Sequence, residues 1–528
     1  MKNRLFKRIG TMLLSFVMFM TMGTATASVF AANPDSGDVL KVLNVEENAT
    51  VTAYKIVKED SGKWVKTSDK ISIADPAKPS AAEVSAIAAS AEQLAALESF
   101  TLDYDNGVYQ KSGKTPGVYL ILVTGSGSTL YNPMLVSIDY DGQVDEVSAK
   151  SDFGYDGNVA YAKSSTPTVE KTNDKTGRTE TGTTNKGTSV SVGDKVGFTI
   201  KTTIPSYSDQ YRDVRFNITD ELDEGLTAPE TGDVTVKVGG NAVSFSNYTI
   251  EKKGNGFEIA FTSAYIKSLA AKTAAERAVV VTYSATVNEN AKFNYIPNNN
   301  DAEITFTNKP DGSTGGDEDN SKIYTFGLDA NLNGTSKTKN KKTHEVIKLD
   351  ENGQAQTLDY NEDGSETTVT NPLAGAVFGL YSDENCKNEI KRATTTANGY
   401  MEMTGLSEGT YYLKEISAPS GYVPSDKVLT VNITAQYDEK GVLQKHTVNI
   451  TDGDKTYGST YKATYASDGS LDNITADSTT IFIVNSKVPG LPSTGGIGTY
   501  IFTVLGVMIM AAAAVMLRKR YKNADKAK

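Results

Sequence analysis

Segments in which apolar and polar residues alternate recur along most of this 528-residue chain. In the stretch 190–204, for example, Val196, Phe198 and Ile200 share one parity, and polar or small residues fill the positions between them. Successive side chains of a strand point to opposite faces, so this pattern gives a strand one apolar face. Gly, Asp and Asn separate the segments, which is typical of turns between strands. The pattern predicts a chain made mostly of strands.

Similar patterns predict strands at six other places, which are 51–57, 118–123, 134–138, 278–287, 304–308 and 429–433. The residues 436–442 between apolar runs predict a hairpin turn. One helix is predicted at 79–97, because Ser80 can cap it and Val84, Ile87 and Leu94 recur at helical spacing. The predicted fold class is all-β, with tandem immunoglobulin-like β-sandwich domains.

The length of the chain predicts about three folded domains. We expect an N-terminal domain at 32–164, a second domain at 165–310 and a third domain at 323–487. The boundaries follow a linker at 164–167 and a polar connector at 309–322, which is rich in Asp and Gly. Cys386 is the single cysteine. No internal disulfide can form, so the domains must be stabilised by their cores or by another covalent device.

The N-terminus has the features of a secretory signal peptide. Four basic residues precede an apolar stretch at 12–22 that is too short to span a membrane: Lys2, Arg4, Lys7 and Arg8. Small-residue cleavage patterns follow at 25–27 and 29–31. Residues 1–31 are therefore predicted to be removed during export.

Three features follow one another at 491–528: the pentapeptide Leu491-Pro492-Ser493-Thr494-Gly495, an uncharged apolar run at 500–517, and a basic tail that begins at Arg518. At roughly 1.5 Å per residue the apolar run spans about 27 Å, close to the thickness of a bilayer core. The basic tail holds the C-terminal end on the cytoplasmic side. The sequence predicts a transmembrane helix with the pentapeptide just outside the membrane.

This arrangement resembles the LPXTG cell-wall sorting signal of Gram-positive surface proteins. The resemblance implies that a sortase recognises Leu491 and Pro492 and cuts between Thr494 and Gly495. The sortase cysteine then holds the Thr494 carbonyl as a thioester and passes it to an amine. The chain would therefore be a secreted, cell wall-anchored protein that meets the membrane only before sorting.

The formal charge is −11 for the whole chain and about −20 for the exported part, since the leader and the tail are both basic. Such an acidic surface argues against nucleic acid and anionic lipid as partners. His344 and His446 are far apart in sequence, and nothing near Cys386 would lower the pKa of its thiol. We predict no metal site, no cofactor and no enzymatic activity.

The third domain carries three motifs of one known family. Residues 411–422 read YYLKEISAPSGY, residues 373–381 read LAGAVFGLY, and residues 481–485 read IFIVN. The first resembles the E-box of collagen-adhesin B-type domains in Gram-positive pilins, and the others resemble an early strand and the last strand of the same domains. The resemblance implies an internal isopeptide bond between a lysine and an asparagine.

That chemistry needs an amine, a carboxamide and an acid in an apolar core. Burial disfavours charge, so the lysine becomes a neutral nucleophile and the acid stays protonated and polarises the carboxamide. By resemblance, Glu415 is the acid and Asn485 the acceptor. Lys348 is the preferred lysine, and four other lysines remain possible: Lys337, Lys339, Lys341 and Lys342.

The second domain offers a parallel set. Its first strand, last strand and an acidic strand end resemble the isopeptide-forming second domain of major pilins. The resemblance implies a bond from Lys171 to Asn308 with Asp220 as the acid, and Glu221 and Asp223 are the alternatives for that acid.

Residues 159–163, VAYAK, resemble the pilin motif VYPK, with Ala162 in place of its proline. In that motif the lysine attacks the acyl-sortase that carries another subunit. Lys163 is accordingly the predicted polymerisation site, at the end of the first domain where a sortase can reach it.

Together the motifs resemble a sortase-assembled major pilin, the shaft subunit of a covalent fimbria. The implied partners are a pilus-type sortase, a wall-anchoring sortase with peptidoglycan precursor, further copies of the chain and minor pilins. The alternative is a monomeric wall-anchored adhesin, or a minor pilin at the tip or base, that binds a host ligand. Such a protein would share the signal peptide, the domains and the anchor, but would not need Lys163.

Overall fold

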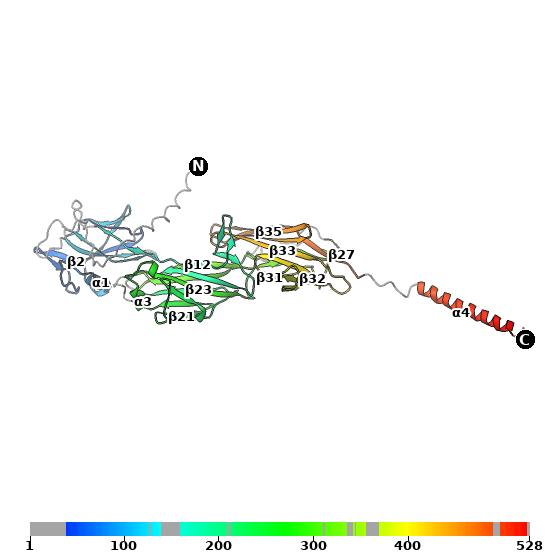
Figure 1. Cartoon of the computed structure of the whole chain (residues 1–528). Coiled ribbons are helices and arrows are strands. Elements are labelled where there is room, and N and C mark those ends of the chain that lie inside the picture. Colours follow the sequence, from blue (N-terminus) through cyan, green and yellow to red (C-terminus); the bar gives the residue numbers. More distant parts are fainter. Residues whose placement is uncertain are drawn as a thin grey trace, which may run out of the picture. The chain divides into compact units, whose positions relative to one another are not determined.

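The computed structural model describes residues 39–125, 128–138, 159–207, 211, 213–309, 312–334, 342–343, 345–354, 369–488 and 497–524. The predicted signal peptide lies outside the described residues. Strands dominate the described chain, as Figure 1 shows, which confirms the all-β prediction.

The chain forms two compact units. One contains Met1–Lys175, Lys195–Asn288 and Asn298–Lys322, and the other contains Thr176–Asp194, Glu289–Pro297 and Ile323–Lys528. We keep the names first, second and third domain for the residue ranges that the sequence predicted. The first two fall largely in one unit.

In the first domain, a sheet of order β3-β2-β7-β9 holds the three strands that were predicted there. Its strands are β2 (Thr50–Asp60), β3 (Lys63–Lys66), β7 (Gly117–Thr124) and β9 (Met134–Ile138), and β4 (Ser99–Thr101) pairs with β2. A second sheet of order β10-β1-β6-β5 contains β1 (Leu40–Leu43), β5 (Asp103–Asp105), β6 (Val108–Lys111) and β10 (Val159–Tyr161).

The helix predicted at 79–97 is two shorter helices, α1 (Ala81–Ala88) and α2 (Ala91–Ala95). Ser80 and Glu83 form a capping box at the start of α1. Ser90 interrupts the Ala-rich run, because its side chain accepts a hydrogen bond from the backbone N–H of Gln93 and caps α2. A serine inside a helical pattern thus became a second N-cap.

The second domain is a sandwich of two sheets. One includes the order β12-β16-β23-β19, with strands β12 (Glu170–Asn173), β16 (Lys195–Thr203), β23 (Ala278–Val287) and β19 (Thr235–Val238). The other includes the order β25-β24-β17-β22-β21, with strands β25 (Thr314–Tyr324), β24 (Asn298–Thr307), β17 (Phe216–Leu222), β22 (Gly256–Phe261) and β21 (Tyr248–Lys253). Alternate residues of β17, β23 and β24 are buried, so both sheets turn an apolar face to a common core.

Two segments predicted as connections are paired strands. In the predicted linker, β11 (Ser164–Ser165) pairs with β8 (Leu130–Tyr131). In the predicted connector, most residues belong to β25. Two of its acidic side chains are half-buried and bonded: Asp317 accepts a hydrogen bond from the backbone N–H of Val169 at 2.8 Å, and Asp319 accepts one from the backbone N–H of Lys171 at 2.6 Å. Composition suggested a linker because it does not reveal such partners.

The third domain also has two main sheets. The smaller has the order β28-β27-β37, with strands β28 (Thr370–Pro372), β27 (Val346–Gln354) and β37 (Ile481–Asn485). The larger has the order β30-β29-β32-β33-β34-β35-β36, with strands β30 (Glu389–Thr394), β29 (Val377–Tyr381), β32 (Gly409–Ser417), β33 (Val428–Tyr437), β34 (Leu443–Asp452), β35 (Lys455–Tyr465) and β36 (Leu471–Ser478). The predicted hairpin turn joins β33 to β34.

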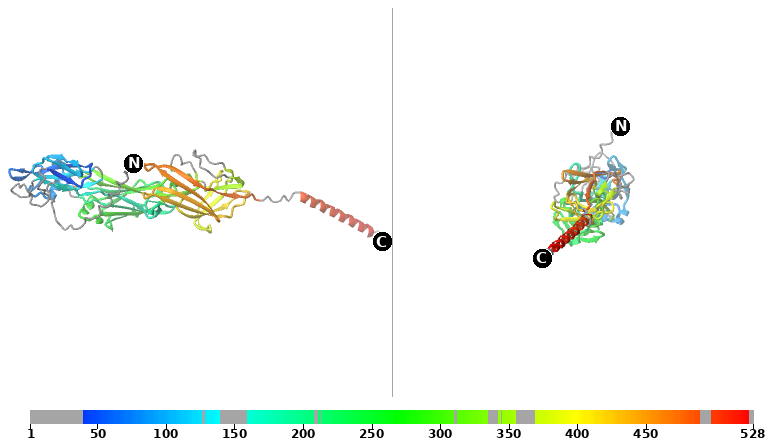
Figure 2. Two further views of the ribbon diagram at one scale, coloured as in Figure 1. Left: turned by 90° about the horizontal axis from the view of Figure 1, so that it is seen from above. Right: turned by 90° about the vertical axis from the view of Figure 1, so that its right-hand side faces the viewer.

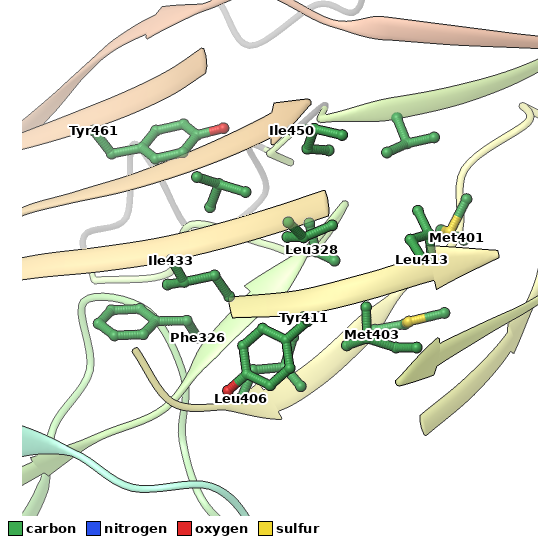
Figure 3. Close-up of a cluster of buried hydrophobic side chains, with 14 of the residues drawn as sticks. Phe326, Leu328, Met401, Met403, Leu406, Tyr411, Leu413, Ile433, Ile450 and Tyr461 are labelled. Carbon is green, nitrogen blue, oxygen red and sulfur yellow. The ribbon is translucent and has the colours of Figure 1, made fainter. Parts of the chain in front are cut away.

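Apolar side chains from both sheets, and from the paired strands β26 (Phe326–Leu328) and β31 (Met403–Leu406), fill one core. Figure 3 shows Phe326, Leu328, Met403 and Leu413 among these side chains. His446 lies in this core as well, fully buried, with its ring stacked on Phe326 and Tyr461. Burial lowers the pKa of His446 to about 3, so this histidine is a neutral core residue.

The remaining elements of the described chain are short: β13 (Gly177–Arg178), β14 (Thr183–Thr184), β15 (Gly187–Ser189), β18 (Leu226–Thr227), β20 (Asn241–Ala242), α3 (Ser263–Ser268), and the 3₁₀ turns at Thr231–Asp233 and Ala275–Arg277.

The predicted transmembrane run lies in one helix, α4 (Ile497–Ala524). Its stretch Thr499–Lys522 has a mean hydropathy of 2.4 over its most apolar part, and none of that part is buried inside the described chain. Figure 2 shows α4 as one uninterrupted helix, coloured red. By length and composition the helix can cross a membrane. The pentapeptide 491–495 lies outside the described residues.

Candidate functional sites

The third domain brings Lys348, Glu415 and Asn485 together. Lys348 Nζ donates a hydrogen bond to Asn485 Oδ1 at 2.5 Å and another to the backbone oxygen of Ile483 at 3.1 Å. Asn485 Nδ2 donates to Glu415 Oε1 at 2.6 Å, and Lys348 Nζ lies 3.6 Å from Glu415 Oε2. All three side chains are buried. The amine thus contacts the carboxamide that it would attack, and the acid contacts both.

Strand parity explains why these polar groups meet inside a core. Asn485 continues the buried face of β37 that includes Ile483, and Glu415 continues the buried face of β32 that includes Leu413. Strands β27 and β37 are parallel neighbours, with Lys348 opposite Ile483 in register. Lysine and asparagine therefore come from adjacent strands of one sheet, and the acid comes from the facing sheet.

Burial prepares Lys348 to act as a nucleophile. Removal from water lowers the pKa of this lysine from 10.5 to about 8, although the nearby Glu415 carboxylate opposes that shift. Glu415 is itself oriented by the backbone N–H of Ser425, which donates to Oε2 at 3.0 Å. A substantial neutral fraction of the Lys348 amine therefore exists at ordinary pH.

This lowered pKa predicts a specific pH dependence in a Glu415→Gln variant that still forms the bond slowly. Cross-link formation should rise about tenfold per pH unit while the amine is mostly protonated, and should level off at or below about pH 8. The plateau falls there because the substitution removes the carboxylate that raises the lysine pKa. The rate of cross-link formation is measured by peptide mapping of samples held at different pH. A rate that keeps rising toward pH 10.5 would contradict the assigned lysine environment.

The alternatives to Lys348 do not reach this site where the structure describes them. Lys342 forms a partly exposed ion pair with Glu402, at 3.1 Å. Lys337, Lys339 and Lys341 lie outside the described residues, as does His344.

The second domain holds a comparable cluster around Lys171 and Asp220, which form a fully buried ion pair. Burial lowers the pKa of Lys171 and raises the pKa of Asp220, and their mutual attraction opposes both shifts. Tyr283 joins them: its hydroxyl donates to Asp220 Oδ1 at 2.5 Å and accepts from Lys171 Nζ at 2.9 Å. The alternatives for the acid are less enclosed, since Glu221 is exposed and Asp223 is half-buried.

The asparagine at this cluster is Asn300, and the structure does not bring Asn308 to Lys171. Asn300 is fully buried, and its Nδ2 donates to the Tyr283 hydroxyl at 2.7 Å. The Lys171 and Asn300 nitrogens contact the same oxygen, so they lie less than about 6 Å apart. Asn308 follows eight residues later, about 26 Å further along an extended chain. We therefore replace Asn308 by Asn300 as the candidate acceptor.

Sequence reasoning missed Asn300 and Tyr283, although the parity of their strands carried a signal. Asn300 shares the buried face of β24 with Ala302 and Ile304, and Tyr283 shares the buried face of β23 with Val281. Asn308 has the same parity as Asn300. The choice between them depends on the pairing of β24 with β17, where Leu222 lies opposite Asn300.

Lys163 lies between two paired strands of the first domain. The preceding residue, Ala162, donates its N–H to the backbone oxygen of Leu43 at 2.9 Å, and the backbone oxygen of Lys163 accepts from Asn132 at 3.1 Å. The side chain of Lys163 is exposed. The backbone is thus held on both sides while the amine remains accessible to a large partner.

Four domain models match the chain. A T6 antigen Ig-like domain matches residues 35–183, and the Cna-B-like domain of Gram-positive pilin backbone subunit 2 matches residues 192–310. A prealbumin-like fold domain matches 364–449, and the LPXTG cell wall anchor motif matches 483–525. These matches cover parts of all three predicted domains and the C-terminal segment.

The trypsin-resistant surface T6 protein of Streptococcus pyogenes serotype M6 is 26% identical over 578 residues, which cover 97% of this chain and 100% of that protein. The serine-aspartate repeat-containing protein C of Staphylococcus aureus is 42% identical over 67 residues, which cover 13% of this chain and 7% of that protein. Among solved structures, the T6 backbone pilin of S. pyogenes serotype M6 is similar with a TM-score of 0.59 and 21% identity, covering 87% of this chain and 100% of that one. This last likeness establishes the fold.

Proposed function

Since this chain is a sortase-assembled backbone pilin of the Gram-positive type, a subunit of a pilus shaft anchored at the cell wall, we propose that Thr494 of each copy is joined to Lys163 of the next. The same two positions are used at every joint, so the copies repeat head to tail. Such a heterologous joint does not close on itself and produces an open fibre.

The joining step exchanges one amide for another. The sortase cysteine attacks the Thr494 carbonyl, the bond to Gly495 breaks, and the Gly495 amine leaves with the membrane helix. The neutral amine of Lys163 then attacks the thioester and releases the cysteine thiol. We propose a pilus-type sortase for this step. A wall-anchoring sortase would transfer the last subunit to peptidoglycan precursor, and minor pilins would join through the same chemistry.

The placement of Lys163 supports this role most directly. A nucleophile for an enzyme-bound acyl group must be accessible, and its backbone must hold still while the two proteins meet. Lys163 combines an exposed side chain with a backbone bonded on both sides. The lysines of the two buried clusters lack the first property.

For the interior we propose two isopeptide bonds, from Lys348 to Asn485 and from Lys171 to Asn300. In each case the lysine amine attacks the asparagine Cγ, the bond from Cγ to Nδ2 breaks, and ammonia leaves with a proton from the lysine. The contact of 2.5 Å between Lys348 Nζ and Asn485 Oδ1 is the observation that carries this proposal. The residues act once on their own chain, and we propose no enzymatic activity toward other substrates.

Mass spectrometry of the full chain, produced in cells that lack sortase, tests both bonds at once. Each bond releases ammonia, so the mass should fall about 17 Da per bond, or about 34 Da in total, below that of the processed sequence. In each of the variants Lys171→Ala and Lys348→Ala, one of the two bonds cannot form. The measured mass should therefore lie only about 17 Da below the mass of that variant's own processed sequence. Peptide mapping then identifies the joined residues. A chain at its full sequence mass would remove the internal bonds from the proposal.

A further inference from the structure

The hydroxyl of Tyr283 is the common contact of every reacting group in the second domain. It donates to Asp220 Oδ1 at 2.5 Å, accepts from Lys171 Nζ at 2.9 Å and accepts from Asn300 Nδ2 at 2.7 Å. A phenol has one proton to donate and two lone pairs to accept with, so this oxygen is fully used. The Tyr283 side chain is also almost completely buried.

The carboxamide of Asn300 depends on this tyrosine. Within the described residues, its only side-chain hydrogen bond is the one to Tyr283, and its Oδ1 is buried without a partner. The acid Asp220 has its two oxygens on Lys171 and Tyr283. The hydroxyl therefore stands between the acid and the carboxamide.

In the third domain the acid contacts the carboxamide directly, without a tyrosine between them. There the acid is a glutamate, one methylene longer than aspartate, and Glu415 Oε1 accepts directly from Asn485 Nδ2 at 2.6 Å. In the second domain the shorter side chain of Asp220 contacts the Tyr283 hydroxyl, and that hydroxyl contacts the carboxamide of Asn300. A carboxylate oxygen therefore contacts the leaving nitrogen in the third domain, and a phenol oxygen contacts it in the second domain.

On the premise that Lys171 and Asn300 form the proposed bond, we propose that Tyr283 is a further catalytic residue, which relays a proton from Asp220 to the leaving nitrogen of Asn300. The proton would pass along two short hydrogen bonds of the Tyr283 hydroxyl, one with Asp220 Oδ1 and one with Asn300 Nδ2. The role needs a neutral phenol, and burial together with the charge of Asp220 keeps the pKa of Tyr283 well above its usual range.

The relay balances over the whole reaction. The reaction starts from the neutral pair, in which Lys171 is an amine and Asp220 carries a proton. Lys171 Nζ attacks Asn300 Cγ, and the carbonyl electron pair moves to Oδ1. Asp220 gives its proton to the phenol through Oδ1, Tyr283 gives its own proton to Nδ2, and Asp220 Oδ2 takes one proton from Nζ. The carbonyl re-forms as the bond from Cγ to Nδ2 breaks, and ammonia leaves. Asp220 and Tyr283 end as they began.

The rings around Tyr283 fix the direction of its hydroxyl. Its ring is stacked on Phe198 at a centroid distance of 5.6 Å and meets Phe257 edge to face at 5.1 Å. A Tyr283→Phe substitution retains these ring contacts and removes only the oxygen. It is therefore a suitable test of the relay.

The experiment compares full chains with Tyr283→Phe and with Tyr207→Phe, analysed for both bonds by peptide mapping immediately after purification and during incubation. Tyr207 is a buried tyrosine of the same domain whose hydroxyl donates to the backbone oxygen of Thr307 at 2.9 Å. Tyr283→Phe should slow formation of the second-domain bond by about 10²–10⁴-fold, while Tyr207→Phe leaves it complete. The Lys348–Asn485 bond in the same molecules is the internal reference.

A double variant separates proton relay from packing. Tyr283→Phe with Asp220→Glu should regain part of the lost bond formation, because a longer acid can reach the carboxamide directly, whereas a packing defect would not be repaired in this way. Normal bond formation in Tyr283→Phe, or no recovery in the double variant, would overturn the relay. If the unaltered chain lacks the second-domain bond, the proposed function of that site fails instead, which is a different result.

Discussion

Replacement of Lys163 by alanine is expected to abolish the ladder of covalent oligomers that unaltered cells should show when wall extracts are boiled in detergent. The joint between copies is an amide bond, so detergent and heat cannot separate them, and without the Lys163 amine the thioester has no pilin nucleophile. The variant should still appear as a single wall-linked species, because the Thr494 end is intact. Immunoblots of wall extracts give the measurement.

The matched control is Lys58→Ala, an exposed lysine on β2 of the same domain, which should leave the ladder unchanged. A ladder that persists without Lys163 would move the joint to another lysine. A single band from unaltered cells would instead support the monomeric adhesin or a minor pilin, since neither needs a polymerisation lysine.

Lys348→Met is expected to remove a large part of the stability of the third domain. The cross-link would join residues that are 137 positions apart. A cross-link that closes a loop of this length stabilises the folded state by about 5 kcal/mol when treated as a disulfide would be. Methionine retains most of the apolar stem of the side chain, so lost packing adds little.

Hydrogen exchange of peptides from β33 and β34 at increasing denaturant measures this loss within the third domain. Lys391→Met is the control, since Lys391 Nζ donates to the backbone oxygen of Thr404 at 2.6 Å but lies outside the cluster. Loss of this hydrogen bond should lower the free energy of unfolding of the third domain by about 1 kcal/mol. Equal protection of the Lys348→Met chain and the unaltered chain would contradict a cross-link at this position.

How far the sequence predicts these sites depends on which contacts a pattern can encode. Glu415 and Asn485 could be predicted because they belong to motifs that resemble those of a known family, and the structure continues the buried faces of β32 and β37 to these two residues. For the lysine the sequence favours Lys348 but leaves four alternatives, and the parallel pairing of β27 with β37 places Lys348 beside Asn485. In the second domain, Asn300 and Asn308 have the same parity, and only the strand register distinguishes them.

The polar segment at 309–322 shows a second limit. Its composition is that of a flexible linker, yet Asp317 and Asp319 accept backbone hydrogen bonds from residues about 150 positions earlier. Nothing in a local window of sequence reveals such a partner. The single helix expected at 79–97 failed for a related reason, because Ser90 can act as a cap as well as a helix residue.

The parallel pairing of β27 with β37 has a consequence for a chain pulled from its ends. With Lys348 bonded to Asn485, tension would pass from one strand to its neighbour through that bond. The chain between these two residues, which are 137 positions apart, would carry no load. That stretch of chain could otherwise add about 470 Å of contour length. In a force–extension record the bonded domain would therefore release none of this contour length. The third domain of each subunit in the fibre would not lengthen under load.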